Sequence, residues 1–289
     1  MNTKLDLLRL ENSSPSFPPA LLHIDAPPES LWARGRLELA VDQVPRVAIV
    51  GTRAPTPYGE AQAQRFGRAL AQAGIIVVSG LARGVDQAAH SAVLDADGDT
   101  IAVLGSGLDR PWPNVPLVGR IASKGLLLSE FEPQMPPRPH HFPLRNRIIS
   151  GLCDGLIVIE AAAASGSLIS AQWALDQGRE VFALPGRVDH PMSAGCHKLL
   201  REGAALVESP QELLDLLYGD LRPRRLTESA ALQLTPLEEA LRGETLSPDE
   251  LAESLQLTVP EVLVQVVTLE LDGRIARAPG GLYRLCSLD

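Results

Sequence analysis

The stretch Arg46-Val-Ala-Ile-Val-Gly-Thr-Arg53 is a short apolar run that ends at a glycine, and a Pro-containing turn separates it from a helical pattern over Tyr58–Ala73. Its four apolar residues do not alternate with polar ones, which is typical of a parallel strand buried on both faces. Gly51 lets a ligand approach the backbone closely. The turn predicts that free N–H groups of Thr52 and Arg53 and the start of a helix face one spot beyond the strand, and such a spot attracts phosphate.

Short apolar runs and helical patterns alternate along the chain after this stretch. The expected strands cover residues 75–79, 100–104, 125–131, 155–161, 180–184 and 204–208, with helices between most of them. Such alternation predicts a doubly wound, mostly parallel sheet with helices on both faces, which is an α/β domain over residues 46–218. The order of the strands in the sheet stays open.

The two ends of the chain differ from this α/β pattern. Residues 1–45 form a lead-in that we expect to pack on the core as an edge segment, with a short strand over 21–24. Residues 219–234 contain Arg222-Pro-Arg-Arg225 and are expected to form an exposed linker. Residues 235–289 carry three helical patterns followed by a hairpin pattern, which is the outline of a small winged-helix domain.

The chain is acidic on average, but its charge is unevenly distributed. Its 289 residues carry a formal net charge of −9. Residues 46–209 hold 15 basic and 15 acidic residues, whereas residues 220–289 hold 7 basic and 12 acidic ones. A polyanion is therefore expected to meet a local patch of the α/β domain, and the C-terminal unit would repel it. The third helix of that unit, 259–272, has acidic residues and no basic one, which favours protein contact over DNA reading.

Composition also bears on location and chemistry. The apolar runs are four to seven residues long, well short of the roughly 20 needed to span a bilayer. The first ten residues lack the apolar centre of a signal peptide, so we expect a cytoplasmic protein without a membrane partner. Cys153, Cys196 and Cys286 are odd in number and far apart, so neither a disulfide framework nor a zinc site is predicted. His140-His141 has no third ligand in fixed register, and no metal site is predicted there.

Three strand ends carry glycine-rich turns, namely Gly51-Thr52-Arg53, Gly80-Leu-Ala-Arg83-Gly84 and Gly105-Ser-Gly107. A single such turn also occurs where a helix packs close to a strand, but three of them favour an anion-binding shelf. None completes the dinucleotide fingerprint, and the chain has no P-loop motif. Neither a nicotinamide cofactor nor nucleotide hydrolysis is therefore predicted.

The Pro-rich loop over residues 133–143 runs into Phe142-Pro-Leu-Arg145-Asn146-Arg147 at the first turn of an expected helix. A base stacked on an aromatic side chain gains about 1–3 kcal/mol, and neighbouring arginines hold phosphates. Arg53 and Arg83, on neighbouring strand ends, would complete a positive groove. In the alternative interpretation, Phe142 fills the core and the arginines pair with Asp or Glu.

Ser165-Gly166-Ser167 follows the expected strand over 155–161, and its serines can cap the next helix and donate to a phosphate oxygen. Glu160 is either a general acid or base at a pocket or a structural acceptor for a neighbouring loop, and the residues leave both readings open. Asp86 and His90 are spaced i,i+4 and are expected to hydrogen-bond each other. No serine lies in a nucleophile elbow, so nucleophilic catalysis has no support.

These motifs closely resemble those of the DprA/Smf family, the DNA-processing protein A of natural transformation. The resemblance covers about residues 17–209 with many motifs in the right order. It is carried by Val47–Arg53, Ser79–Asp86 with Ala89-His90, Ile101–Asp109, Ser129-Glu130, Phe142–Ile149, Glu160-Ala161 with Ser165–Leu168, Gly178–Gly186 and Ser193–Cys196.

The resemblance implies an extended Rossmann-type domain that binds single-stranded DNA without sequence preference and forms a homodimer. It further implies that the protein loads the RecA recombinase on strands otherwise covered by single-strand-binding protein, and it implies neither catalysis nor a cofactor. The DNA pocket it implies coincides with the groove expected from the strand ends. The nucleic-acid-binding residues that the resemblance implies are Gly51, Thr52, Arg53, Phe142, Arg145, Asn146, Arg147, Ser165, Gly166 and Ser167, and the strand-end argument adds Arg83.

Three departures from the family pattern matter. Ala164 stands where a basic residue is usual, so one phosphate contact is expected to be missing or supplied from elsewhere. His197 stands where an Asn is usual, which puts any polar role there in doubt. Only about 45 residues precede the first long strand, so the helical domain that often precedes the family core is not expected.

The rival hypothesis belongs to another class, an enzyme that acts on a nucleotide. Phosphoribohydrolases of a related Rossmann group also place a glycine-rich strand end before a Glu, in a PGGxGTxxE motif. The nearest stretch here, Ala163–Leu168, lacks the paired glycines, and position 171 is Ala instead of an acid. A double-strand reader using the winged helix is disfavoured by the acidity of that unit. The binding protein is therefore the favoured hypothesis, and Arg53→Ala or Arg147→Ala is expected to lower its affinity for every sequence.

Overall fold

The computed structural model describes residues 6–219, 235–271, 274–278 and 280–285, and the chain divides into two compact units, residues 1–226 and 227–289. Each unit is described by itself. Apart from Gly219, the expected linker over 219–234 lies outside the described residues, as do the third cysteine and residue 272.

The larger unit is built on a sheet whose strands are short and mostly buried. They are β1 (Leu8–Glu11), β2 (Ser30–Gly35), β3 (Arg46–Val50), β4 (Ile76–Ser79), β5 (Thr100–Val103), β6 (Leu126–Ser129), β7 (Gly155–Val158), β8 (Glu180–Ala183) and β9 (Ala205–Leu206). Within the described residues their order is β1-β2-β6-β5-β4-β3-β7-β8-β9. Strands β3 to β9 run parallel to their neighbours among themselves, and β1 and β2 form an antiparallel edge beside β6.

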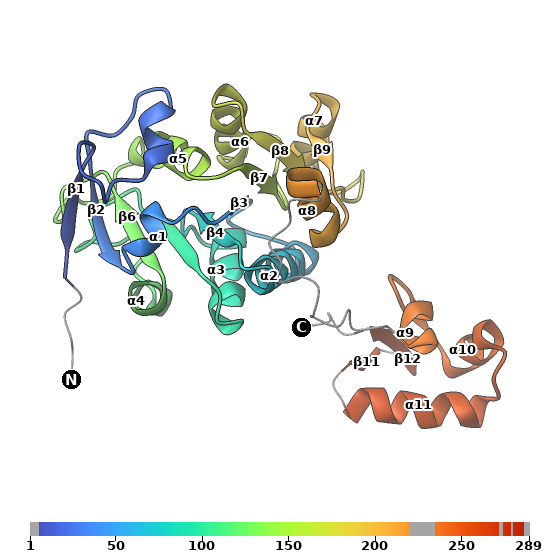
Figure 1. The fold of residues 1–289 in the computed structure, drawn as a ribbon. Coiled ribbons are helices and arrows are strands. Elements are labelled where there is room, and N and C mark those ends of the chain that lie inside the picture. Colours follow the sequence, from blue (N-terminus) through green and yellow to red (C-terminus); the bar gives the residue numbers. More distant parts are fainter. Residues whose placement is uncertain (1–5, 220–234, 272–273, 279, 286–289) are drawn as a thin grey trace. The chain divides into compact units, whose positions relative to one another are not determined.

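Helices connect these strands and cover both faces of the sheet. They are η1 (Pro19–His23), α1 (Glu38–Val41), α2 (Pro57–Gln72), α3 (Val85–Asp95), α4 (Pro116–Lys124), α5 (His141–Gly151), α6 (Ser167–Asp176), η2 (Pro191–Ser193), α7 (Ala194–Arg201) and α8 (Pro210–Tyr218). Helices α5, α6 and α7 lie on one face, and α2, α3 and α4 lie on the other (Figure 1). The expected doubly wound, mostly parallel fold is confirmed.

Strand β3 shows why its sequence lacks alternation. Ala48 and Val50 belong to the core under α5, α6 and α7, whereas Val47 and Ile49 belong to the core under α2 and α3. Successive side chains of a strand point to opposite faces, so a strand covered on both faces is apolar at every position. All four side chains are at most 3% exposed.

The lead-in contributes the β1-β2 edge of the sheet, but the strand expected over residues 21–24 is wrong. That stretch belongs to the 3-10 helix η1, which has a proline in its first turn. Leu21 is fully buried while its neighbour Leu22 is 45% exposed, so the segment buries one side only. The strands of the lead-in are instead β1 and β2, and β2 pairs with β6 through residues such as Trp32 and Ser129.

The smaller unit has the predicted winged-helix outline. Its elements are α9 (Pro236–Ala240), β10 (Thr245–Leu246), α10 (Pro248–Leu255), α11 (Val259–Leu271), β11 (Ile275–Ala278) and β12 (Leu282–Leu285). Thr235 and Ser247 each begin a helix with a reciprocal capping box. Leu237, Leu251 and Val262 are fully buried in its core.

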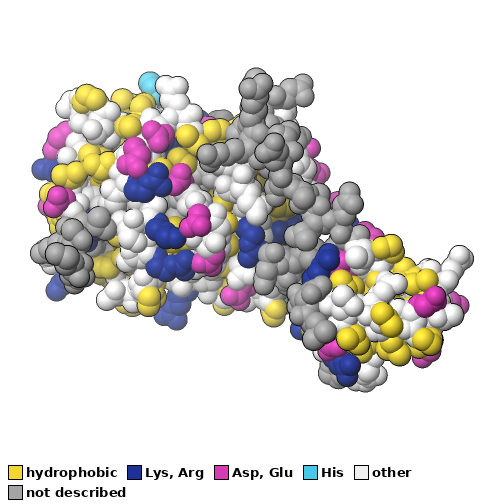
Figure 2. All heavy atoms as spheres, turned by 60° about the horizontal axis from the view of Figure 1, so that its bottom comes forward, with side chains coloured by type: hydrophobic (Ala, Val, Ile, Leu, Met, Phe, Trp, Pro, Cys, Tyr) yellow, Lys and Arg dark blue, Asp and Glu magenta, His cyan; other side chains and the backbone are white. Residues whose placement is uncertain are grey.

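Helix α11 presents an apolar and acidic surface. Leu263, Val264 and Val267 are 41%, 69% and 48% exposed, and Glu261 is exposed beside them. Figure 2 shows hydrophobic side chains on the surface of this unit. The described part of α11 has no cation that could contact DNA phosphates. Among the described residues, no helix is long and apolar enough to cross a bilayer.

Candidate nucleic-acid interface

The main cleft of the larger unit lies where the chain changes direction in the sheet. Strand β3 is flanked by β4 on one side and by β7 on the other. Later strands extend the sheet outward from both, so the carboxyl ends of β3 and β7 form a topological switch point, which is the usual binding crevice of an open α/β sheet. A cleft of about 650 Å³ opens there, between the turn after β3, the start of α5 and the start of α6.

The cleft gathers most of the residues predicted for the site. Arg83 lies in an adjoining cavity of about 330 Å³, and Arg147 lines neither hollow. The predicted residues that line the cleft are Gly51, Thr52, Arg53, Phe142, Arg145, Asn146, Ser165, Gly166 and Ser167.

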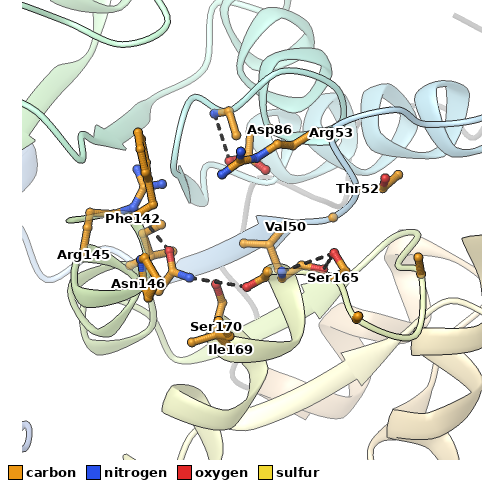
Figure 3. Close-up of a pocket in the computed structure, with 18 of the residues that line it drawn as sticks. Val50, Thr52, Arg53, Asp86, Phe142, Arg145, Asn146, Ser165, Ile169 and Ser170 are labelled. Carbon is orange, nitrogen blue, oxygen red and sulfur yellow. Dashed lines mark hydrogen bonds between the residues drawn. The ribbon is translucent and has the colours of Figure 1, made fainter. Parts of the chain in front are cut away.

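Arg53 and Phe142 form the exposed part of the cleft wall. The Arg53 guanidinium lies 5.6 Å from the centre of the Phe142 ring, a cation–π contact. Arg53 is exposed and Phe142 is partly buried, so the ring does not fill the core. In Figure 3, Phe142 lies on the α5 side and Ser165 on the opposite side of the cleft. Among the described residues, Arg53 has no carboxylate partner, and its charge is available to a ligand.

Arg145 lies beneath this wall as a buried cation. It is 4% exposed and donates to the carbonyl oxygen of Gly80 over 2.8 Å and to that of Val103. Burial lowers the pKa of Arg145 to about 10, and the charge of Asp86 opposes that shift. Arg145 therefore remains charged at neutral pH, but its donors are largely occupied by the protein. Arg145 therefore contributes positive potential to the cleft, and it has few free donors for direct contacts with a phosphate.

Arg147 corrects the prediction that both arginines of α5 face the groove. Its guanidinium makes a two-pronged ion pair with the Glu130 carboxylate over 2.8 and 2.7 Å, and its Nε donates to the Ala26 carbonyl oxygen over 2.9 Å. The two side chains of the pair are 5% and 13% exposed. The alternative interpretation, pairing with an acid, holds for Arg147, because two residues further along a helix a side chain points about 200° around the axis.

The glycines of the strand-end turns make room for these side chains. A Cβ on Gly80 would lie 2.6 to 2.7 Å from the Arg145 guanidinium, and one on Gly105 would lie 2.7 Å from the Phe142 ring. The prediction of a free Thr52 N–H is wrong, because this group donates to the Glu160 carbonyl oxygen over 2.7 Å. Gly80 and Gly105 are therefore needed because a larger residue would collide with the Arg145 or Phe142 side chain.

The amino terminus of α6 supplies the opposite wall. Helix α6 begins at Ser167, and its cap residue Gly166 has no side chain to satisfy the first N–H groups. Ser165 Oγ accepts from Ser167 N over 3.3 Å and lies 2.8 Å from Ser167 Oγ. Asn146 Nδ2 reaches the Gly166 carbonyl oxygen at 3.5 Å, which ties this turn to α5. The N–H groups of Ser167, Leu168 and Ile169 already donate to acceptors within this turn, over 3.3, 3.1 and 3.2 Å. The helix dipole still makes the turn a favourable position for a phosphate.

The acidic residues around the cleft have structural roles. Glu160 accepts from Thr56 N over 2.9 Å and from Thr56 Oγ1 over 2.6 Å, so it holds the start of α2 in place. Asp86 accepts from the N–H groups of Gly80 and Ala82 over 3.1 and 3.2 Å. Burial raises the pKa of Asp86 to about 6. Asp86 is thus an acceptor for the turn after β4.

The predicted hydrogen bond between Asp86 and His90 is wrong. His90 Nδ1 instead lies 2.7 Å from Thr100 Oγ1 at the start of β5. The ring is fully buried, and burial lowers its pKa to about 3, which keeps it neutral. Asp86 and the Nδ1 atom of His90 therefore pair with residues at strand ends, whereas His90 Nε2 is buried without a hydrogen-bond partner among the described residues.

The histidines and cysteines that could bind a metal or act as nucleophiles lie in structural surroundings. Among the described residues, no cluster of three His, Cys, Asp or Glu could hold a metal ion. His141 stacks on Phe131 at 3.9 Å between ring centres. Cys153 and Cys196 are buried thiols, and burial raises the pKa of Cys196 to about 12.

The structure locates two of the residues that depart from the family pattern. Ala164 is exposed on the rim of the cleft, where a longer basic side chain would reach a bound strand. His197 Nε2 lies 3.0 Å from the Gly186 carbonyl oxygen, so it fixes the loop after β8.

Sequence reasoning missed Trp112, which lines the adjoining cavity. Its signal was an aromatic residue between two prolines just after a glycine-rich strand end.

Comparisons with known proteins agree with this architecture. A family model described as DNA recombination-mediator protein A matches residues 9–218, and one described as the DprA winged helix domain matches residues 222–281. The chain is 43% identical over 282 residues to Protein Smf of Escherichia coli, covering 93% of this chain and 75% of that protein. It is 45% identical over 200 residues to the DNA processing protein DprA of Streptococcus pneumoniae, covering 68% and 70% respectively.

Two solved structures are similar to the larger part of the chain. The X-ray structure of DprA from Streptococcus pneumoniae matches with a TM-score of 0.69 and 42% identity, covering 74% of this chain and 75% of that one. DprA from Helicobacter pylori, whose structure is described as showing a single-stranded DNA binding mode, matches with a TM-score of 0.68 and 34% identity, covering 76% and 99%. The chain therefore belongs to the DprA/Smf family, the family of DNA recombination-mediator protein A.

Proposed function

We propose that this protein binds single-stranded DNA without sequence preference in the cleft and takes part in DNA processing during transformation and recombination. The observation that carries the proposal is the pairing of an exposed guanidinium, Arg53, with the accessible ring of Phe142 opposite the amino terminus of α6. An aromatic face, a cation and the positive end of a helix dipole are features that hold a single strand.

Each group has a separate part in this binding. A base stacks on the Phe142 ring, and every base has a face suited to this contact, so stacking carries little sequence information. Arg53 neutralises one phosphate, and the positive end of the α6 dipole attracts another. The related protein from Helicobacter pylori, described as binding single-stranded DNA, supports the same ligand for this chain.

A binding role is favoured over an enzymatic one. Both carboxylate oxygens of Glu160 accept hydrogen bonds from Thr56, which leaves no poised general base at the end of β7. The buried thiols lie in the apolar core and are not paired with a base. The alternative, a phosphoribohydrolase-like enzyme, predicts release of free base from a nucleoside monophosphate and loss of that release in Glu160→Gln. We expect no release.

The partners follow from the family. We propose that the protein acts in the cytoplasm as a homodimer and transfers its strand to RecA in competition with single-strand-binding protein. The acidic and apolar α11 surface is proposed to contact protein. In a strand-exchange assay on strands coated with single-strand-binding protein, the wild type should stimulate RecA, and Arg53→Ala should not.

Fluorescence anisotropy with labelled single strands tests the binding proposal. Arg53→Ala should lower the affinity by a similar factor for oligothymidylate and for mixed sequences, because a phosphate contact is independent of the base. The matched control is Arg120→Ala, which removes an exposed cation that pairs with Asp95 on the α3 and α4 side. Equal affinity of wild type and Arg53→Ala would exclude the cleft as the binding site.

A further inference from the structure

We infer that the cavity adjoining the cleft is a second nucleobase site in which Trp112 is the stacking platform. This inference rests on the proposed function, since it extends the path of the same single strand. The cavity measures about 330 Å³ and is lined by Trp112, Pro113, Arg83, Arg53, Phe142 and Arg145, among others.

The cavity and the main cleft are parts of one groove. Arg53, Phe142 and Arg145 line both hollows. The Phe142 ring therefore stands between them and presents a surface to each. A strand that enters at the amino terminus of α6 and passes the Phe142 ring reaches the second hollow, because Arg53, Phe142 and Arg145 border both spaces.

Trp112 has the properties of a binding platform. The residue is 50% exposed although its ring is large and apolar. An indole offers the largest aromatic face of any side chain, and bases stack on such faces regardless of their identity. In the free protein, a ring exposed to this extent is accessible to a base.

The loop that carries Trp112 is held in place. Its Asp109 accepts from Arg34 over 2.7 Å and from Gln134 over 2.9 Å. The Asp109 N–H donates to the Pro133 carbonyl oxygen over 3.0 Å. Prolines on both sides of Trp112 restrict its backbone further. Little conformational freedom is lost when a base binds, so the platform is pre-organised.

The charges around Trp112 select an anionic partner. Arg53 and Arg83 are exposed, and among the described residues neither has a carboxylate partner. An apolar protein surface placed here would desolvate both guanidinium groups without compensation. A nucleotide instead provides a ring for the indole and a phosphate for the arginines. Arg83 is placed to hold the phosphate that joins the base on Phe142 to the base on Trp112.

The test is a titration of oligothymidylate into the wild type, Trp112→Ala and Trp112→Phe. Loss of one stacked base should weaken binding about 5- to 150-fold in Trp112→Ala, and Trp112→Phe should retain most of the affinity. Tyr58→Ala, which removes an exposed aromatic ring that lines neither hollow, is the matched control and should bind like the wild type.

Tryptophan emission gives a second readout. A base stacked on Trp112 should quench part of the wild-type emission, and Trp112→Phe should lose this part while it still binds DNA. If Trp112→Ala binds like the wild type while Arg53→Ala binds weakly, the second base site is wrong and the proposed function stands. If Arg53→Ala also binds like the wild type, both proposals fail.

Discussion

Arg147→Ala removes a guanidinium that the structure places in a closed ion pair and not in the cleft. Glu130, whose side chain is 13% exposed in the intact pair, would lose its two donors, and the Ala26 carbonyl oxygen would lose its partner. Breaking a buried ion pair from one side costs about 3–5 kcal/mol. For a unit of this size each kcal/mol lowers the midpoint of thermal unfolding by about 2–4 °C, so we expect a decrease of about 6–20 °C.

Two measurements on Arg147→Ala separate stability from binding. Urea unfolding should show the loss of free energy, whereas anisotropy at a temperature where the variant is folded should show an affinity and a salt dependence near those of the wild type. Arg187→Ala is the matched control, because its pair with Asp189 is 80% and 64% exposed. Solvent screens such a pair, so the control should be about as stable as the wild type. A variant as stable as the wild type that bound DNA tenfold more weakly would refute the reasoning.

The remaining predictions concern single positions in and around the cleft. Phe142→Ala should weaken single-strand binding by about 1–3 kcal/mol, while Phe142→Tyr keeps the stacking face and most of the affinity. Ala164→Lys should tighten binding and steepen the salt dependence by about 0.7 in the log–log slope, because it adds a phosphate contact at the rim. Burial raises the pKa of Asp86 to about 6, so its protonation stabilises the fold below about pH 4 and this stabilisation is lost as the pH rises through about 6. Asp86→Asn cannot ionise, and its free energy of unfolding relative to the wild type should rise by about 3 kcal/mol from about pH 4 to about pH 8.

The fold was predictable because its strands are buried on both faces. A run such as Val47–Val50 is apolar at every position, and this pattern does not depend on which helix covers it. The lead-in was harder, since the apolar residues of η1 lie beside prolines and resemble a short strand as much as a turn of helix. The antiparallel pairing of β2 with β6 joins residues far apart in the chain, and no local signal specifies it.

The sequence predicted which strand ends form the site, but it did not predict the directions in which the side chains point. Arg145 and Arg147 are two residues apart on one helix, and both looked like phosphate ligands. The structure buries one beneath the wall and pairs the other with Glu130, which lies beyond β6. The exposed positive charge is therefore smaller than four arginines would supply, and it is concentrated on Arg53 in the cleft and Arg83 in the adjoining cavity.

The most direct test of the account is the salt dependence of single-strand affinity in the wild type and in Arg53→Ala. Each phosphate neutralised on a single strand contributes about −0.7 to the slope of log K against log salt concentration. The account predicts a weaker affinity for Arg53→Ala at low salt and a slope less steep by about 0.7. Coincident or parallel lines for the two proteins would contradict the claim that Arg53 holds a phosphate in this cleft.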